Sequence, residues 1–167
     1  ITWPFRFSVL LNNLIPGVVD WTTINQYTVP ERSDELKAAG VDADARRPAH
    51  VRGYRRAFAQ GSTDHRGTPE APGRVVTLLV QASATCHGVA YRVPAELRSA
   101  TLDYLDARES GGYVRHALPL HLDGGEAVHG LTYVAHPGNP NHLGETSLDA
   151  LVHQVLHAHG PSGSNLD

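Results

Sequence analysis

The sequence contains no methionine and a single cysteine, Cys86, among its 167 residues. Because it begins with Ile1 and lacks methionine, we expect it to be a fragment. One cysteine cannot form an internal disulfide, which agrees with a reducing compartment and predicts a cytoplasmic location. No apolar run approaches the ~20 residues that span a bilayer. Residues 1–19 also lack the basic region and small-residue cleavage site of a signal peptide, so no membrane partner is expected.

An excess of charge of one sign is also missing. Fourteen Lys and Arg residues oppose 17 Asp and Glu residues, which gives a formal net charge of -3 at pH 7. Proteins that bind a nucleic-acid duplex usually present a basic face, so no nucleic-acid partner is expected. With 41% hydrophobic and 19% charged residues the chain should fold. Its length predicts a single domain over residues 1–167.

The 16 glycines and 11 prolines fall between apolar runs, which favours strands and turns over long helices. Segments rich in Val, Leu, Tyr and Thr predict strands at residues 7–11, 50–59, 74–80, 88–93, 113–122 and 129–135. These strands follow one another in groups, so antiparallel pairing is expected. The predicted fold class is therefore α+β with a curled or closed sheet, rather than a doubly wound one.

Three helices are predicted between these strands. Residues 31–39 form a short surface helix that ends at Gly40. A second helix follows Pro94 and buries one stripe that includes Leu97, Thr101, Tyr104 and Leu105. The third has Thr146 or Ser147 as its N-cap and ends at Gly160, with apolar residues at helical spacing at Leu148, Leu151, Val152, Val155 and Leu156.

The segment Arg108-Glu109-Ser110-Gly111-Gly112-Tyr113 lies where the second helix should end and a strand begin. Its two glycines let the backbone turn sharply and approach a ligand. The negative end of the helix dipole disfavours the ionised form of Glu109, and burial would raise its pKa further, toward the range where one carboxyl serves as base and then as acid. A simpler alternative stays open, in which Glu109 is exposed or paired with Arg108 and the glycines only cap the helix.

The loop Gln60-Gly61-Ser62-Thr63-Asp64-His65-Arg66-Gly67, followed by Gly73-Arg74, has the composition of an anion-binding loop. Glycine exposes backbone N–H groups, Ser and Thr donate hydrogen bonds, and Arg can bind a carboxylate bidentately. It is not a P-loop, because no Gly-Lys-Ser/Thr follows. A polar turn in which Asp64, His65 and Arg66 bond one another is equally open.

Histidine is abundant, with 11 residues, and His153 and His157 share a helix face, with His159 nearby. No His-Glu-x-x-His pattern supplies further ligands, so we predict no metal site. A Ser/His/Asp triad is not indicated either, since a Gly-x-Ser-x-Gly turn is missing.

Longer motifs resemble those of a known family. They are VRGYRRAFAQGSTDHRGTP at 51–69, PGRVVTL at 72–78, GVAYRV at 88–93, YLDARESGGY at 104–113, NPNHLG at 139–144 and GPSGSNL at 160–166. They resemble those of the ChaC family of glutathione-specific γ-glutamylcyclotransferases, and the resemblance as a whole extends over residues 47–166.

This resemblance implies a small mixed β-barrel with flanking helices. It also implies a lyase reaction, without cofactor, metal or nucleotide, that releases 5-oxoproline and Cys-Gly from glutathione. The glutamate of the family's Arg-Glu-x-Gly-Gly-Tyr motif is the catalytic acid/base, and here it is Glu109. Motif position and chemistry make further residues candidates for substrate binding: Gln60, Gly61, Ser62, Arg66, Arg74 and Tyr113.

The sequence departs from the family at both ends. The family's Tyr-Gly-Ser-Leu loop, which holds the γ-glutamyl group, aligns with Phe7, Ser8, Val9 and Leu10, and only Leu10 matches. A side chain at the Gly position restricts positive φ, and Val9 removes a hydroxyl donor. Residues 1–46 are atypical, and the family continues beyond Leu166 into a further helix. A diverged enzyme, an altered N-terminus and a non-catalytic binding module of the same fold therefore remain alternatives.

Overall fold

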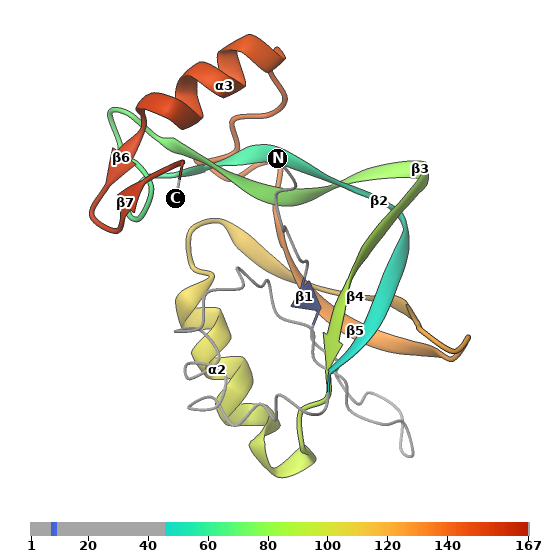
Figure 1. Cartoon of the computed structure of the whole chain (residues 1–167). Helices are drawn as coiled ribbons and strands as arrows, with labels where there is room; N and C mark the ends of the chain where they lie inside the picture. The colour runs from blue at the N-terminus through green and yellow to red at the C-terminus, as the bar shows by residue number, and fades with distance from the viewer. Residues whose placement is uncertain (1–7, 10–45, 167) are drawn as a thin grey trace. The chain divides into compact units, whose positions relative to one another are not determined.

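The structure is a computed structural model that describes residues 8–9 and 46–166 (Figure 1). It has an α+β fold, as predicted. In chain order its elements are β1 (Ser8–Val9), β2 (Arg46–Ser62), β3 (Gly73–Tyr91), the 3-10 turn η2 (Ala95–Leu97), α2 (Arg98–Arg108), β4 (Tyr113–Leu122), β5 (Ala127–Ala135), α3 (Leu148–His157), β6 (His159–Gly160) and β7 (Gly163–Ser164).

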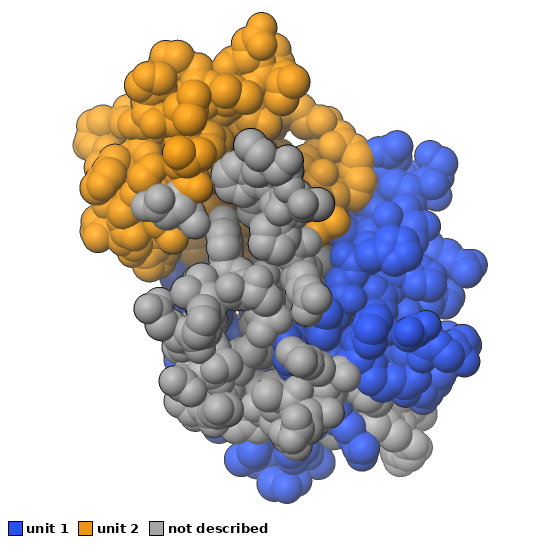
Figure 2. Space-filling model, viewed as in Figure 1, with its two compact units in different colours: residues 1–54, 81–110, 115–133 blue, residues 55–80, 111–114, 134–167 orange. Residues whose placement is uncertain are grey.

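The chain divides into two compact units (Figure 2). The first contains residues 1–54, 81–110 and 115–133, and the second contains residues 55–80, 111–114 and 134–167. The long strands β2 and β3 each run through both units. The expectation of one domain over residues 1–167 stays a prediction.

Strands β1, β2, β3, β4 and β5 all contribute residues to the first unit. They form a closed barrel in the order β1-β3-β2-β4-β5. β1 runs parallel to β3, with Ser8 opposite Val89, and antiparallel to β5, with Val9 opposite Thr132. β2 and β4 pair antiparallel. The sheet is thus mixed, and the two-residue strand β1 joins its edges.

The strand sequences explain which face of the sheet is buried. In β4, Leu118, Leu120 and Leu122 are buried, while the side chains between them are more exposed. This alternation follows from the two-residue period of a strand. On α2 the apolar side chains of Leu102 and Leu105 are buried as well, and they supply the helical part of the core of this unit.

The second unit contains the loop between β2 and β3, α3 and the β6–β7 hairpin. Gly67 and Gly160 allow backbones to pass closely here. A Cβ on Gly67 would lie 2.1 Å from the backbone nitrogen of Gly73, and a Cβ on Gly160 would lie 2.3 Å from the carbonyl oxygen of His65. The loop is therefore packed against the C-terminal segment, at distances that no larger residue permits.

Of the three predicted helices, the second and third are present where expected but differ in detail. Ser147 caps α3 as expected, since its Oγ accepts a hydrogen bond from the N–H of Ala150 at 3.3 Å. The expected end at Gly160 is wrong, because Ala158 is already extended and residues 159–160 pair in β6. The expected helix 31–39 lies outside the described residues.

The buried stripe predicted for the second helix is partly wrong. Thr101 and Leu105 are buried, but Leu97 and Tyr104 are exposed. Leu97 belongs to η2, whose turn has a different period from that of α2, and Leu102 takes the expected place of Tyr104. Within residues 8–9 and 46–166, no helix has the length and apolarity needed to cross a membrane.

Candidate active site

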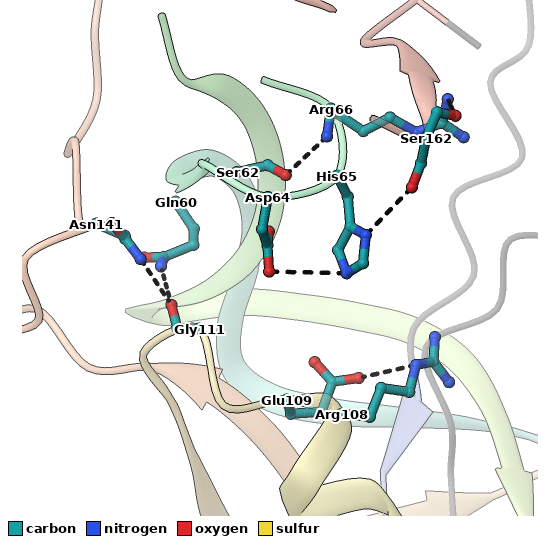
Figure 3. Close-up of polar contacts among 10 residues, drawn as sticks. All are labelled: Gln60, Ser62, Asp64, His65, Arg66, Arg108, Glu109, Gly111, Asn141 and Ser162. Atoms are coloured by element: carbon teal, nitrogen blue, oxygen red, sulfur yellow. Dashed lines mark hydrogen bonds and ion pairs between the residues drawn. The ribbon is translucent and has the colours of Figure 1, made fainter. Parts of the chain in front are cut away.

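Glu109 lies at the end of α2, as the sequence predicted. It is the C-cap residue, and its backbone N–H donates to the carbonyl oxygen of Leu105 at 2.8 Å. Its side chain is 18% exposed, and its Oε1 lies 3.9 Å from Nε of Arg108 (Figure 3). The carboxyl is thus largely withdrawn from water, with the helix dipole opposing its charge and Arg108 favouring it.

The two glycines that follow Glu109 have different roles. Gly112 has a φ of 103°, a conformation that side-chain-bearing residues rarely adopt. A Cβ there would lie 2.4 Å from Oδ1 of Asn139, whereas a Cβ on Gly111 would meet nothing within 4 Å. The turn from the helix into β4 therefore requires glycine at position 112 and not at position 111.

This difference predicts unequal effects of the same substitution. Gly112→Ala should destabilise the protein by about 1–2 kcal/mol for the left-handed backbone alone, with more for the displaced Asn139 side chain. Gly111→Ala is the matched control and should change stability by less than about 0.5 kcal/mol. Urea unfolding of both variants tests the prediction. Equal losses in the two variants would contradict it.

Gln60 is fully buried, and its side-chain amide forms hydrogen bonds with other residues of the second unit (Figure 3). Its Nε2 donates to the carbonyl oxygen of Gly111 at 2.9 Å, and its amide exchanges hydrogen bonds with that of Asn139 at 3.2 Å. Asn141 donates to the same Gly111 oxygen at 3.3 Å. Gly61, the next candidate, donates its N–H to the carbonyl oxygen of Asn141 at 2.7 Å. This amide network fixes the backbone at Gly111.

The loop at residues 60–67, whose composition resembles that of an anion-binding loop, is hydrogen-bonded to the C-terminal segment (Figure 3). Ser62 Oγ accepts a hydrogen bond from the N–H of Arg66 at 3.0 Å. The Arg66 guanidinium donates to the carbonyl oxygens of Ser162 and Ser164 at 3.0 and 2.9 Å. The predicted pair of Asp64 and His65 is present at 3.8 Å. The turn alternative thus accounts for part of the loop, and its anion-binding role stays a prediction.

Arg74 is 6% exposed and donates to neutral acceptors. Nε binds Oε1 of Gln154 at 2.8 Å, and one amino group binds the carbonyl oxygens of Phe58 at 2.9 Å and Gly144 at 2.6 Å. Burial lowers the pKa of its guanidinium. Asn165 bonds the backbone of Arg74 through both its amide nitrogen and its amide oxygen. These bonds join β2, β3, α3 and the C-terminal segment.

The remaining candidates are less informative. Tyr113 donates its hydroxyl to the carbonyl oxygen of Val76 at 2.9 Å. Ser8 and Val9 form β1, whereas Phe7 and Leu10 lie outside the described residues. Sequence reasoning gave no role to Asn139, Asn141, Gln154 and Asn165. The signal that could have found the first two is the Asn-Pro-Asn run within a long polar loop.

Two of the histidines that were considered and rejected as metal ligands, His153 and His157, interact with each other on α3. The rings of His153 and His157 stack with centroids 4.2 Å apart, and Nδ1 of His157 lies 2.7 Å from the carbonyl oxygen of His153. In the part of the chain that the structure describes, no group of three or more His, Cys, Asp or Glu side chains is arranged to hold a metal ion.

The family model and the most similar known proteins point to the same family. The model of the family described as ChaC-like protein matches residues 38–167. Gamma-glutamylcyclotransferase 2-3 of Arabidopsis thaliana is 42% identical over 137 residues, covering 77% of this chain and 68% of that protein. The human glutathione-specific gamma-glutamylcyclotransferase 1 is 42% identical over 125 residues, covering 72% of this chain and 56% of that protein. The chain thus spans little more than half of the human relative.

The structural comparison agrees. The crystal structure of the yeast gamma-glutamyl cyclotransferase specific to glutathione matches with a TM-score of 0.68 and 28% identity, covering 72% of this chain and 73% of that one. The glutathione-specific gamma-glutamylcyclotransferase of Saccharomyces cerevisiae is 31% identical over 167 aligned positions, covering 72% of each chain. Both sequence and fold therefore lead to the same group of proteins.

Proposed function

Since this chain belongs to the ChaC-like protein family, we propose that it is a γ-glutamylcyclotransferase that cleaves glutathione to 5-oxoproline and Cys-Gly. The observation that carries the proposal is the agreement between relatives. The plant relative is named a gamma-glutamylcyclotransferase, the human and yeast relatives are named glutathione-specific gamma-glutamylcyclotransferases, and the yeast structure has the same fold.

The proposed reaction needs one proton carrier. Glu109 takes a proton from the α-ammonium of the γ-glutamyl residue, and the freed amine attacks the γ-carbonyl carbon of the same residue. The bond from that carbon to the cysteine nitrogen breaks as Glu109 returns the proton to the departing nitrogen. The attacking nitrogen then loses its second proton to become the lactam N–H, and the freed amine of Cys-Gly takes up a proton to become an ammonium. All atoms of glutathione are then found in 5-oxoproline and Cys-Gly. The bond changes balance without a co-reactant, because nucleophile and electrophile belong to one molecule.

The protein's main task is then to hold a bent substrate. Intramolecular attack is fast when the reacting atoms are kept in a near-attack geometry, and backbone N–H groups stabilise the carbonyl oxygen as it gains charge. The withdrawal of Glu109 from water supports its part, since fewer water molecules compete for the proton it carries. We also infer a cytoplasmic setting, supported by the single cysteine.

We further propose that the substrate-side residues act largely through backbone that they hold in place. The hydrogen bonds of Gln60, Ser62, Arg66, Arg74 and Tyr113 to protein groups support this idea. Gly61 adds a backbone without a side chain. Phe7, Ser8, Val9 and Leu10 stay candidates for the γ-glutamyl contact, and of these Ser8 and Val9 form β1.

Incubation with glutathione tests the proposal. We expect 5-oxoproline and Cys-Gly to form in equal amounts and in proportion to enzyme, as followed by mass spectrometry. A γ-glutamyl dipeptide without cysteine serves as the comparison substrate for selectivity. A folded protein that releases neither product would contradict the proposal and favour the non-catalytic binding module.

A further inference from the structure

Three polar side chains, Asp106, Arg115 and Tyr133, tie the last turn of α2 to strands β4 and β5. The Tyr133 hydroxyl donates to Oδ1 of Asp106 at 2.5 Å, and Nε of Arg115 donates to the same oxygen at 2.5 Å. A second nitrogen of Arg115 donates to Oδ2 of Asp106. One carboxylate on the helix therefore receives bonds from two strands, all within the first unit.

The pKa shifts of Asp106 and Tyr133 favour the protonation states that their hydrogen bonds require. The bond from Arg115 lowers the pKa of Asp106, burial opposes that shift, and the bond from Tyr133 adds to it. Burial, and then the bond to Asp106, raises the pKa of Tyr133 well above its usual value. At neutral pH the carboxylate is thus ionised and the phenol protonated. Each donor keeps its proton and the acceptor keeps its charge across the physiological range.

The cluster acts on the turn from which Glu109 extends. Asp106 lies three residues before Glu109, and the Glu109 N–H bonds to the neighbouring carbonyl of Leu105. Arg115 also donates to the carbonyl oxygen of Leu102 at 3.4 Å. The apolar side chains of Leu102 and Leu105 hold one face of α2, and Asp106 fixes the rotation of its last turn.

We propose that Asp106, Arg115 and Tyr133 are positioning residues for Glu109, which keep the end of α2 in the place that proton transfer requires. The inference rests on the proposed function. The side chains of Asp106 and Arg115 are 45% and 33% exposed, so solvent screening reduces what their ion pair adds to stability. A displacement of about 1 Å at a catalytic group, by contrast, lowers rates by up to ~10²-fold.

The experiment measures kcat and KM for glutathione in Tyr133→Phe, Asp106→Asn and Arg115→Lys. We expect kcat to fall about tenfold in each, with KM within about twofold of the wild-type value, because Glu109 acts in the chemical step. Arg115→Lys keeps the positive charge but loses the bidentate hydrogen bonding to Asp106. It therefore shows whether the geometry of the hydrogen bonds or the charge alone is needed. Asp103→Asn is the matched control, since Asp103 is an exposed carboxylate on the same helix, and it should retain the wild-type kcat.

The outcomes separate this inference from the proposed function. Wild-type kcat in Tyr133→Phe and Asp106→Asn, beside an active wild type and an inactive Glu109→Gln, overturns the positioning role alone. A raised KM with unchanged kcat overturns it as well, in favour of substrate binding. A wild-type protein without turnover overturns both proposals. If Asp106→Asn fails to fold, Tyr133→Phe decides, because it removes one oxygen atom and keeps the buried ring.

Discussion

Glu109→Gln is expected to reduce kcat for glutathione by about 10²–10⁴-fold, the range that a general acid–base group contributes. The amide has the shape of the carboxyl but cannot take the proton from the α-ammonium. The variant should fold, because the charge that it removes sits at a helix end that disfavours it, and the contact that it weakens, with Arg108 at 3.9 Å, is a long one. Release of 5-oxoproline at saturating glutathione measures the effect.

Glu96→Gln provides the matched control for this result. Glu96 is an exposed glutamate in η2, so the same substitution removes one charge without touching the end of α2. We expect wild-type kcat and KM. If Glu109→Gln kept half or more of the wild-type kcat, Glu109 would not be the proton carrier, and another group would have to supply that step.

Local chemistry was sufficient to predict several elements. The strand predicted at residues 113–122 coincides with β4, and the cap at Ser147 was expected from its hydroxyl. The strand β3 was predicted in two pieces, because residues 81–87 include polar and small side chains with little strand preference. Hydrogen bonding within the closed sheet overrides that preference, and no local pattern reports it.

The candidate site, too, has parts that local sequence signals predict and parts that depend on tertiary pairing. The position of Glu109 could be predicted, because a helix end and a glycine pair are local signals. The amide network could not, since Gln60 and Asn139 are 79 residues apart. Tyr133 and Asp106 are 27 residues apart, and no local pattern relates a strand phenol to a helix carboxylate. Such pairings follow from topology, so they become visible once the strand order is known.

Arg74→Met is expected to lower the free energy of unfolding by at least about 2 kcal/mol, the second large effect. The sequence analysis predicted that Arg74 contacts the substrate. In the structure its guanidinium donates hydrogen bonds to Phe58, Gly144 and Gln154, so we expect it to stabilise the fold. Without the guanidinium, three acceptors around a buried side chain lose their donors, at a cost of ~1–3 kcal/mol for each acceptor left buried. Relief of the buried charge, whose pKa is lowered by burial, offsets part of this loss.

Urea unfolding of Arg74→Met beside Arg92→Met measures the difference. Arg92 is exposed, so the same substitution there should change stability by less than about 0.5 kcal/mol. Arg74→Lys should fall between Arg74→Met and the wild type, because an ammonium keeps the charge but cannot match the planar fork of donors. Wild-type stability in Arg74→Met together with a raised KM for glutathione would reverse the assignment. Arg74 would then bind the substrate, and its contacts to the carbonyl oxygens of Phe58 and Gly144 would contribute little to folding.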